Sequence, residues 1–163
     1  MRLPRLFLNY DGKHILIFKT YNADLSYLEM LRCKTRGHGI TDRVRFVDEV
    51  SPSALPSLYA ATDVVINVPQ RDSIPVTLLE AAACQRAVIS NRLEAYSSIP
   101  DENVTWIPTN DCAALVAAIT ETTNSFQYCE ENFKKGREAI IAGFSERKYQ
   151  DGIAAIYHRL ALT

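Results

Sequence analysis

Residues 63–84 read Asp63-Val64-Val65-Ile66-Asn67-Val68-Pro69-Gln70-Arg71-Asp72-Ser73-Ile74-Pro75-Val76-Thr77-Leu78-Leu79-Glu80-Ala81-Ala82-Ala83-Cys84. The β-branched run over 63–68 predicts a strand, which Pro69 closes. A loop follows, and Pro75 is well placed as the first residue of a helix over Pro75–Cys84. A strand, a loop and a helix in this order are typical of parallel α/β proteins.

The same alternation continues on both sides of this stretch. It predicts further strands over 14–19, 43–47, 87–90 and 104–107, and helices near 23–36, 51–61, 111–120, 125–142 and 145–160. The last helix carries an apolar stripe that is typical of core contact, made of Tyr149, Ile153, Ile156, Tyr157 and Leu160. We therefore predict an α/β fold: one Rossmann-like domain over residues 1–163, with a doubly wound, mainly parallel sheet and helices on both faces.

Composition excludes several classes of protein. The 163 residues are 47% apolar and 23% charged, which fits a single globular domain. A net charge of −1 argues against a nucleic-acid partner. No apolar run approaches the roughly 18–20 residues of a membrane span, and the first residues are too short for a secretory signal, so we expect a soluble, cytoplasmic protein. The four cysteines lack the spacing of a zinc site, so no metal is expected.

Two carboxylates lie near the predicted strand-to-helix connection. Ligands of parallel α/β sheets bind at the carboxyl ends of the strands, where Asp72 falls in the loop and Glu80 in the helix. Glu80 stands in an apolar run, where a carboxylate is costly unless it has a partner. A ribose diol suits this role, because two adjacent hydroxyls can donate to both oxygens. An ion pair with Arg or Lys, or simple exposure, is the alternative.

The order of these features resembles a known family. Asp72-Ser73-Ile74-Pro75 and the run to Glu80 are flanked upstream by 42–46 and 58–65, and downstream by 87–90, 104–108 and 113–119. In this order and spacing the chain is similar, from about residue 14 to 160, to the C-terminal, donor-binding half of group 1 retaining glycosyltransferases of the two-domain GT-B fold. The resemblance implies that the chain binds a nucleotide-diphospho-sugar.

The resemblance also implies residue roles. Glu80 matches the glutamate that holds the ribose hydroxyls, and Asp72 matches the acidic residue that contacts the donor sugar and is our candidate catalytic residue. Catalysis in the family needs no metal or other cofactor. The remaining candidate substrate-binding residues are Ser73, the backbone N–H groups of Ile74 and Val76 facing the sugar and diphosphate, and Val50 near the nucleobase.

Several positions depart from the family pattern. Asp72 replaces the usual glutamate, Ser73 and Gln85 stand where glycine is common, and Lys19-Thr20-Tyr21 replaces a Gly-x-Gly. The Arg and Lys that neutralise the leaving diphosphate in the family have no counterpart that we can place. We therefore expect a domain that is inactive alone and needs an N-terminal acceptor domain or a partner chain, with a homo-oligomer as a further possibility. The alternative is a degenerate, non-catalytic α/β module that binds a partner protein.

The start of the chain leaves two predictions open. In the family a strand precedes the run 14–19, and Leu3–Tyr10 or a second chain could supply it. Asp11-Gly12 is also a hairpin signal, which predicts a short antiparallel pair instead.

Overall fold

A computed structural model describes residues 14–20, 23–102, 104–124 and 130–161. The chain divides into two compact units, Met1–Leu55 and Pro56–Thr163. The two predictions for residues 1–12 lie outside the described residues.

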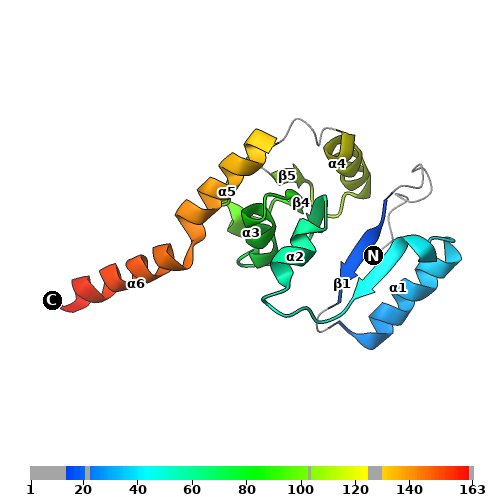
Figure 1. Ribbon diagram of the computed structural model, residues 1–163, viewed down its shortest axis with the longest axis horizontal. Coiled ribbons are helices and arrows are strands. Elements are labelled where there is room, and N and C mark those ends of the chain that lie inside the picture. Colours follow the sequence, from blue (N-terminus) through cyan, green and yellow to red (C-terminus); the bar gives the residue numbers. More distant parts are fainter. Residues whose placement is uncertain (1–13, 21–22, 103, 125–129, 162–163) are drawn as a thin grey trace. The chain divides into compact units, whose positions relative to one another are not determined.

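The first unit is a βαβ arrangement (Figure 1). Strand β1 (Leu16–Lys19) pairs in parallel with β2 (Val44–Val47), and the register runs from Leu16 opposite Val44 to Lys19 opposite Val47. Parallel neighbours need a crossover connection, which is helix α1 (Leu25–Gly37) followed by the short 3-10 helix η2 (Thr41–Arg43). The parallel pairing of the two predicted strands is confirmed.

Local chemistry explains where α1 begins and ends. The side chain of Asp24 caps the helix by accepting a hydrogen bond from the Tyr27 N–H at 3.0 Å. Gly39 follows the helix with φ +66°, a left-handed conformation that glycine adopts without strain. Leu31, Ile40 and Val44 are the buried apolar residues that the helix, the turn and β2 contribute to the core. The helix predicted over 23–36 is thus observed within two residues.

The second unit contains a three-stranded parallel sheet. Its strands are β3 (Val64–Asn67), β4 (Ala87–Asn91) and β5 (Val104–Ile107), in the order β3-β4-β5. All five residues of β4 are buried, because this strand has a neighbour on each side and helices above and below. The other elements are α2 (Leu55–Ala60), α3 (Val76–Ala83), η3 (Glu94–Tyr96), α4 (Cys112–Asn124), α5 (Glu130–Phe144) and α6 (Glu146–Ala161).

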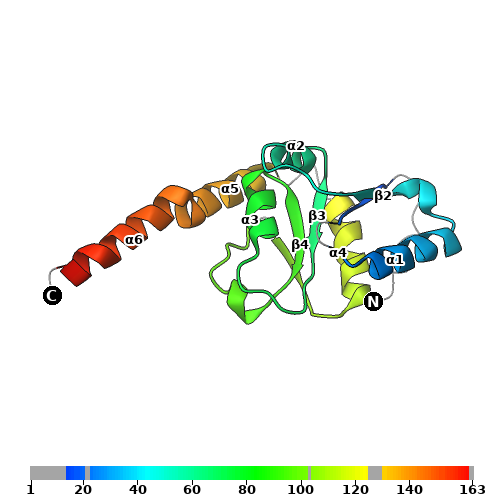
Figure 2. The ribbon, with the colours of Figure 1, turned by 90° about the horizontal axis from the view of Figure 1, so that it is seen from below.

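Helices cover both faces of this sheet. Figure 2 shows α3 and α4 on opposite sides of β3 and β4. Helix α3 buries Leu78, Ala81 and Ala82 completely, and β4 places Val88 and Ile89 in the same core. Helix α5 packs against α3 and buries Phe133 and Ile140 there, while α4 buries Leu115 and Ala118. The α/β class with parallel strands and surrounding helices is confirmed.

Helix α6 contradicts one prediction. Its apolar stripe was expected in the core, but every residue of Glu146–Ala161 is exposed, including Tyr149 at 71% and Tyr157 at 70%. Figure 1 shows α6 continuing away from the sheet of its own unit, beyond the end of α5. The stripe exists at helical spacing, but its side chains are exposed. In the described part of the chain, no helix is long and apolar enough to cross a membrane.

Candidate functional site

The loop between β3 and α3 lies at the carboxyl end of β3, as predicted. Pro69 follows the strand, and Pro75 caps α3 with φ −80°. The helix itself begins at Val76, one residue later than predicted, because Pro75 contributes its carbonyl to the first turn while its own backbone is not helical. Since β4 and β5 run parallel to β3, their carboxyl ends lie at the same edge of the sheet.

Asp72 is exposed in this loop and is held by two donors. Its Oδ1 accepts the Ser73 N–H at 2.8 Å, and its Oδ2 accepts the Tyr96 hydroxyl at 2.6 Å. Tyr96 ends η3, in the connection after β4, and is only 1% exposed. Burial, followed by the hydrogen bond to the Asp72 carboxylate, raises the pKa of the Tyr96 phenol. The buried Tyr96 phenol therefore stays protonated, and its hydrogen bond holds the Asp72 carboxylate in place.

Glu80 has a similar partner. Its Oε2 accepts the Tyr59 hydroxyl at 2.7 Å, and Tyr59 is a buried residue of α2. Burial first, and then the bond to Glu80, raises the pKa of the Tyr59 phenol. The sequence left an ion pair open as an alternative for Glu80, but the partner that the structure provides is a tyrosine. The Glu80 residue is half-buried.

The other candidate residues divide between the two units. Ile74 and Val76 are 63% and 56% exposed, and Ser73 is exposed beside Asp72. The Val76 N–H donates to the Ile74 carbonyl at 2.9 Å, a tight local contact that a ligand at this N–H would replace. Val50 follows β2 in the first unit, so its predicted role beside the nucleobase stays a prediction.

Two asparagines, the half-buried Asn67 and the buried Asn91, were missed by the sequence prediction. Asn67 and Asn91 are the last residues of β3 and β4. Asn91 is 1% exposed, and its Nδ2 donates to the Pro69 carbonyl at 2.6 Å and to the Thr109 hydroxyl at 3.2 Å. Asn91 Oδ1 is buried and has no partner in the described part of the chain, and the buried Asn67 Nδ2 lies beside the Tyr96 hydroxyl, whose pKa it lowers slightly against the larger effect of burial. A polar residue at the end of an apolar strand was the available signal.

Such unsatisfied polar atoms are costly, and a polar ligand or water is the usual remedy. The carboxyl edge therefore brings together the tethered carboxylate of Asp72 and the amides of Asn67 and Asn91, while Glu80 lies in the second turn of the helix that begins there. Within the described ranges, no group of three or more His, Cys, Asp or Glu side chains is placed to hold a metal ion. The expectation that no metal or cofactor is needed stays a prediction.

The fold and this edge define a Rossmann-like α/β protein with a polar site at the ends of its parallel strands. Residues 22–125, more than half of the chain, match the family described as "Glycosyl transferases group 1". The chain therefore belongs to the group 1 glycosyltransferases. This match gives no support to the alternative of a non-catalytic module that binds a partner protein.

Solved structures show the same fold. The chain is similar to a sucrose-phosphate synthase from Thermosynechococcus elongatus (TM-score 0.79, 18% identity, 97% of this chain and 48% of the other). It is also similar to HepE from Anabaena in complex with UDP (TM-score 0.84, 16% identity, 94% of this chain and 43% of the other). Both comparisons are with GT-B glycosyltransferases, as the sequence resemblance implied.

A curated relative adds a local match. It is a D-inositol 3-phosphate glycosyltransferase from Salinispora tropica, 42% identical over 69 residues, which are 42% of this chain and 14% of the relative. The chain spans less than half the length of this enzyme and of the two solved structures.

Proposed function

We propose that this chain is the donor-binding half of a retaining glycosyltransferase and binds a nucleotide-diphospho-sugar at the carboxyl edge of its sheet. The observation that carries the proposal is the pair of tethered carboxylates on one strand–loop–helix segment, Asp72 bonded to Tyr96 and Glu80 bonded to Tyr59. Structures of HepE with UDP and with UDP-glucose support a ligand of this class. Transfer itself would need the acceptor-binding half, on the same or another chain.

Glu80 would hold the ribose. Tyr59 donates to Oε2 and restrains the side chain, and the remaining lone pairs of the carboxylate would accept from the two sugar hydroxyls. A positioned carboxylate loses little side-chain entropy when the ligand arrives, so the tyrosine makes the site stronger as well as more specific. Each hydrogen bond to a charged group contributes about 1.5–3 kcal/mol.

Asp72 would contact hydroxyls of the donor sugar. Its two bonds, to Ser73 and Tyr96, hold the short side chain against the loop, and a shorter acid than the family's glutamate has less reach. Backbone N–H groups near Ile74 and Val76, at the start of α3, would face the diphosphate, where the helix dipole favours negative charge. The unpaired Oδ1 of Asn91 offers a further acceptor at this edge.

Titration calorimetry of the full chain with UDP, GDP and ADP tests the proposal. We expect one of the three to bind, and Glu80→Ala to weaken that binding about tenfold to a hundredfold. Glu138→Ala, which removes an exposed carboxylate from α5, is the matched control and should bind like the parent chain. Equal affinities of the Glu80 and Glu138 variants, or a folded chain that binds none of the three at millimolar concentration, would contradict the proposal.

A further inference from the structure

The first unit contains a strongly basic segment that the proposed function does not use. Residues 32–45 include five Lys and Arg and a single acid, Asp42, in a chain whose net charge is −1. The segment spans the end of α1, the η2 turn and the start of β2. It therefore lies at the amino end of β2, whereas ligands of parallel sheets are expected at the carboxyl ends.

Three of these basic side chains line an open pocket of about 330 Å³. Its lining includes three arginines, two threonines and one aromatic ring: Arg32, Arg36, Arg45, Thr35, Thr41 and Phe46. All of them belong to the first unit. The volume falls within the range of about 300–1,000 Å³ that is usual for small-molecule sites.

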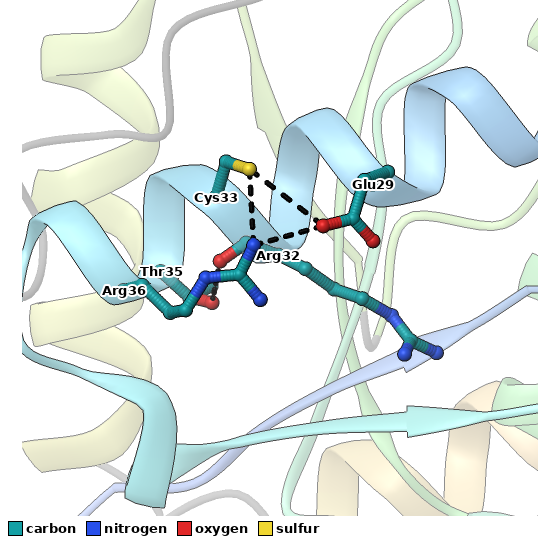
Figure 3. A network of polar contacts seen from close by, with 5 residues as sticks. All are labelled: Glu29, Arg32, Cys33, Thr35 and Arg36. Carbon is teal, nitrogen blue, oxygen red and sulfur yellow. Dashed lines mark hydrogen bonds and ion pairs between the residues drawn. The ribbon is translucent and has the colours of Figure 1, made fainter.

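Each arginine is positioned by a contact that leaves donors unused. Arg36 Nη2 donates to Glu29 at 2.8 Å and to the Cys33 sulfur at 3.0 Å (Figure 3). Arg32 reaches away from that group, and its guanidinium lies 5.2 Å from the centre of the Phe46 ring. Arg45 Nη1 donates to the carbonyls of Asp42 and Val44 at 2.9 and 3.2 Å. A guanidinium has five N–H donors, so all three can still bind a ligand.

Helix electrostatics alone does not account for this group. Lys34 and Arg36 lie in the last turn of α1, where basic residues interact favourably with the helix dipole. Arg45 lies on β2 instead, and it faces the same pocket. The carboxylate of Glu29 forms an ion pair with one of the three arginines that line the pocket, Arg36. Positive charge therefore exceeds negative charge around the pocket.

We propose that this pocket is a second binding site, which takes the phosphoryl group of a small anionic ligand. Planar guanidinium groups match the oxygen geometry of phosphate, with two parallel hydrogen bonds from one arginine. The hydroxyl of the exposed Thr41 adds an uncharged donor, whereas the buried Thr35 hydroxyl already donates to the Arg32 carbonyl at 2.8 Å. The site is separate from Asp72 and Glu80, which belong to the second unit, and it does not rest on the proposed function.

Titration of the full chain with inorganic pyrophosphate tests the proposal, with UDP present in excess to fill any nucleotide site. We expect pyrophosphate to bind, and Arg32→Gln or Arg45→Gln to weaken it about tenfold or more. Arg147→Gln, which removes the same charge from the exposed helix α6, is the matched control and should bind like the parent chain. Glu80→Ala should also bind pyrophosphate normally, which separates this site from the donor site.

A second measurement identifies the residues directly. Phenylglyoxal modifies accessible arginines, and mass spectrometry locates the modified positions. Pyrophosphate should protect Arg32, Arg36 and Arg45, and should leave Arg147 unprotected. Absence of pyrophosphate binding, or equal binding by the Arg45 and Arg147 variants, would overturn the proposal.

A third experiment distinguishes a free phosphorylated ligand from a lipid headgroup. Phosphatidylcholine vesicles with a minor share of phosphatidic acid present the same chemistry on a surface. Binding of pyrophosphate without sedimentation on these vesicles supports a free ligand. Sedimentation that Arg45→Gln abolishes and Arg147→Gln retains supports a lipid headgroup in the same site.

Discussion

Two tyrosines, Tyr59 and Tyr96, determine how the candidate carboxylates are presented. A carboxylate on a loop or a helix normally samples several rotamers, and binding a ligand then costs conformational entropy. Here Tyr96 donates to Asp72 and Tyr59 donates to Glu80, and both phenols are themselves packed into the body of the second unit. The rings are thus rigid supports for the charged groups at the edge of the sheet.

The same two hydrogen bonds lead to a prediction about stability and tyrosine ionisation at alkaline pH. Both phenols have a pKa above the ordinary value of about 10, so the folded chain retains protons that the unfolded chain releases. The stabilisation is complete below about pH 10 and is lost as the pH rises further. Absorbance at 295 nm should therefore show a late-ionising group of tyrosines, which Tyr59→Phe and Tyr96→Phe each reduce.

Tyr157→Phe is the control for that titration. Tyr157 is 70% exposed on α6, so its removal should leave the late group unchanged. A titration in which the Tyr59 and Tyr96 variants ionise like the parent chain would show that these phenols are not held by burial and the carboxylates.

The sequence could indicate the two carboxylates of the candidate site but not the tyrosines that hold them, and the reason is physical. Asp72 and Glu80 could be selected because a strand–loop–helix order places them at a carboxyl edge. Their tyrosine partners lie 24 and 21 residues away, on elements whose packing no local pattern records. The roles of Ser73, Ile74, Val76 and Val50 toward a ligand stay predictions.

At the level of elements, α3 and α6 have similar apolar spacing and opposite surroundings. Helix α3 lies between the sheet and α5, and its inner residues are fully buried. Helix α6 has a stripe of five large apolar residues, and all of them are exposed. Periodicity reports which side of a helix is apolar, but it does not report whether a partner covers that side.

The difference predicts unequal costs for one substitution. Leu78→Ala on α3 removes a side chain with no exposed surface and leaves a cavity, so we expect a loss of about 2–5 kcal/mol in the free energy of unfolding. Leu160→Ala on α6 removes a side chain that is 66% exposed, so we expect a change within about 0.5 kcal/mol. Urea titration followed by Trp106 fluorescence measures both, and a Leu160 variant as unstable as the Leu78 variant would contradict this assignment.

At the level of the whole chain, the two units have different cores. The second has a central strand with neighbours on both sides and several residues with no exposed surface. The first has two strands and one long helix, with buried residues such as Leu31 that keep about 6% of their surface. The single domain predicted over residues 1–163 and the cytoplasmic location stay predictions.

Hydrogen exchange should reveal this difference. Amides of residues 88–90 in β4 should exchange more than about tenfold more slowly than amides of residues 16–19 in β1, because local opening of the smaller unit exposes less apolar surface. Mass spectrometry of peptic fragments, or amide NMR, resolves the two segments. Equal protection of the two strands would mean that both units open in one cooperative step.

The fold class was predictable from sequence because strands and helices alternate along the entire chain and each element is locally consistent. The division into a two-stranded and a three-stranded sheet was not, since strand order depends on contacts between distant segments. The exposed state of α6 escaped prediction for the same reason.

That exposure affects how this chain responds to heat. A helix of 16 residues with no buried side chain is near the length at which helices are marginal in water, and Gly152 in its middle weakens it further. We expect α6 to lose helical structure gradually as the temperature rises, while the sheet around β4 stays folded until it unfolds cooperatively. The far-ultraviolet signal therefore slopes well before the sheet unfolds, and a single melting temperature describes the sheet alone.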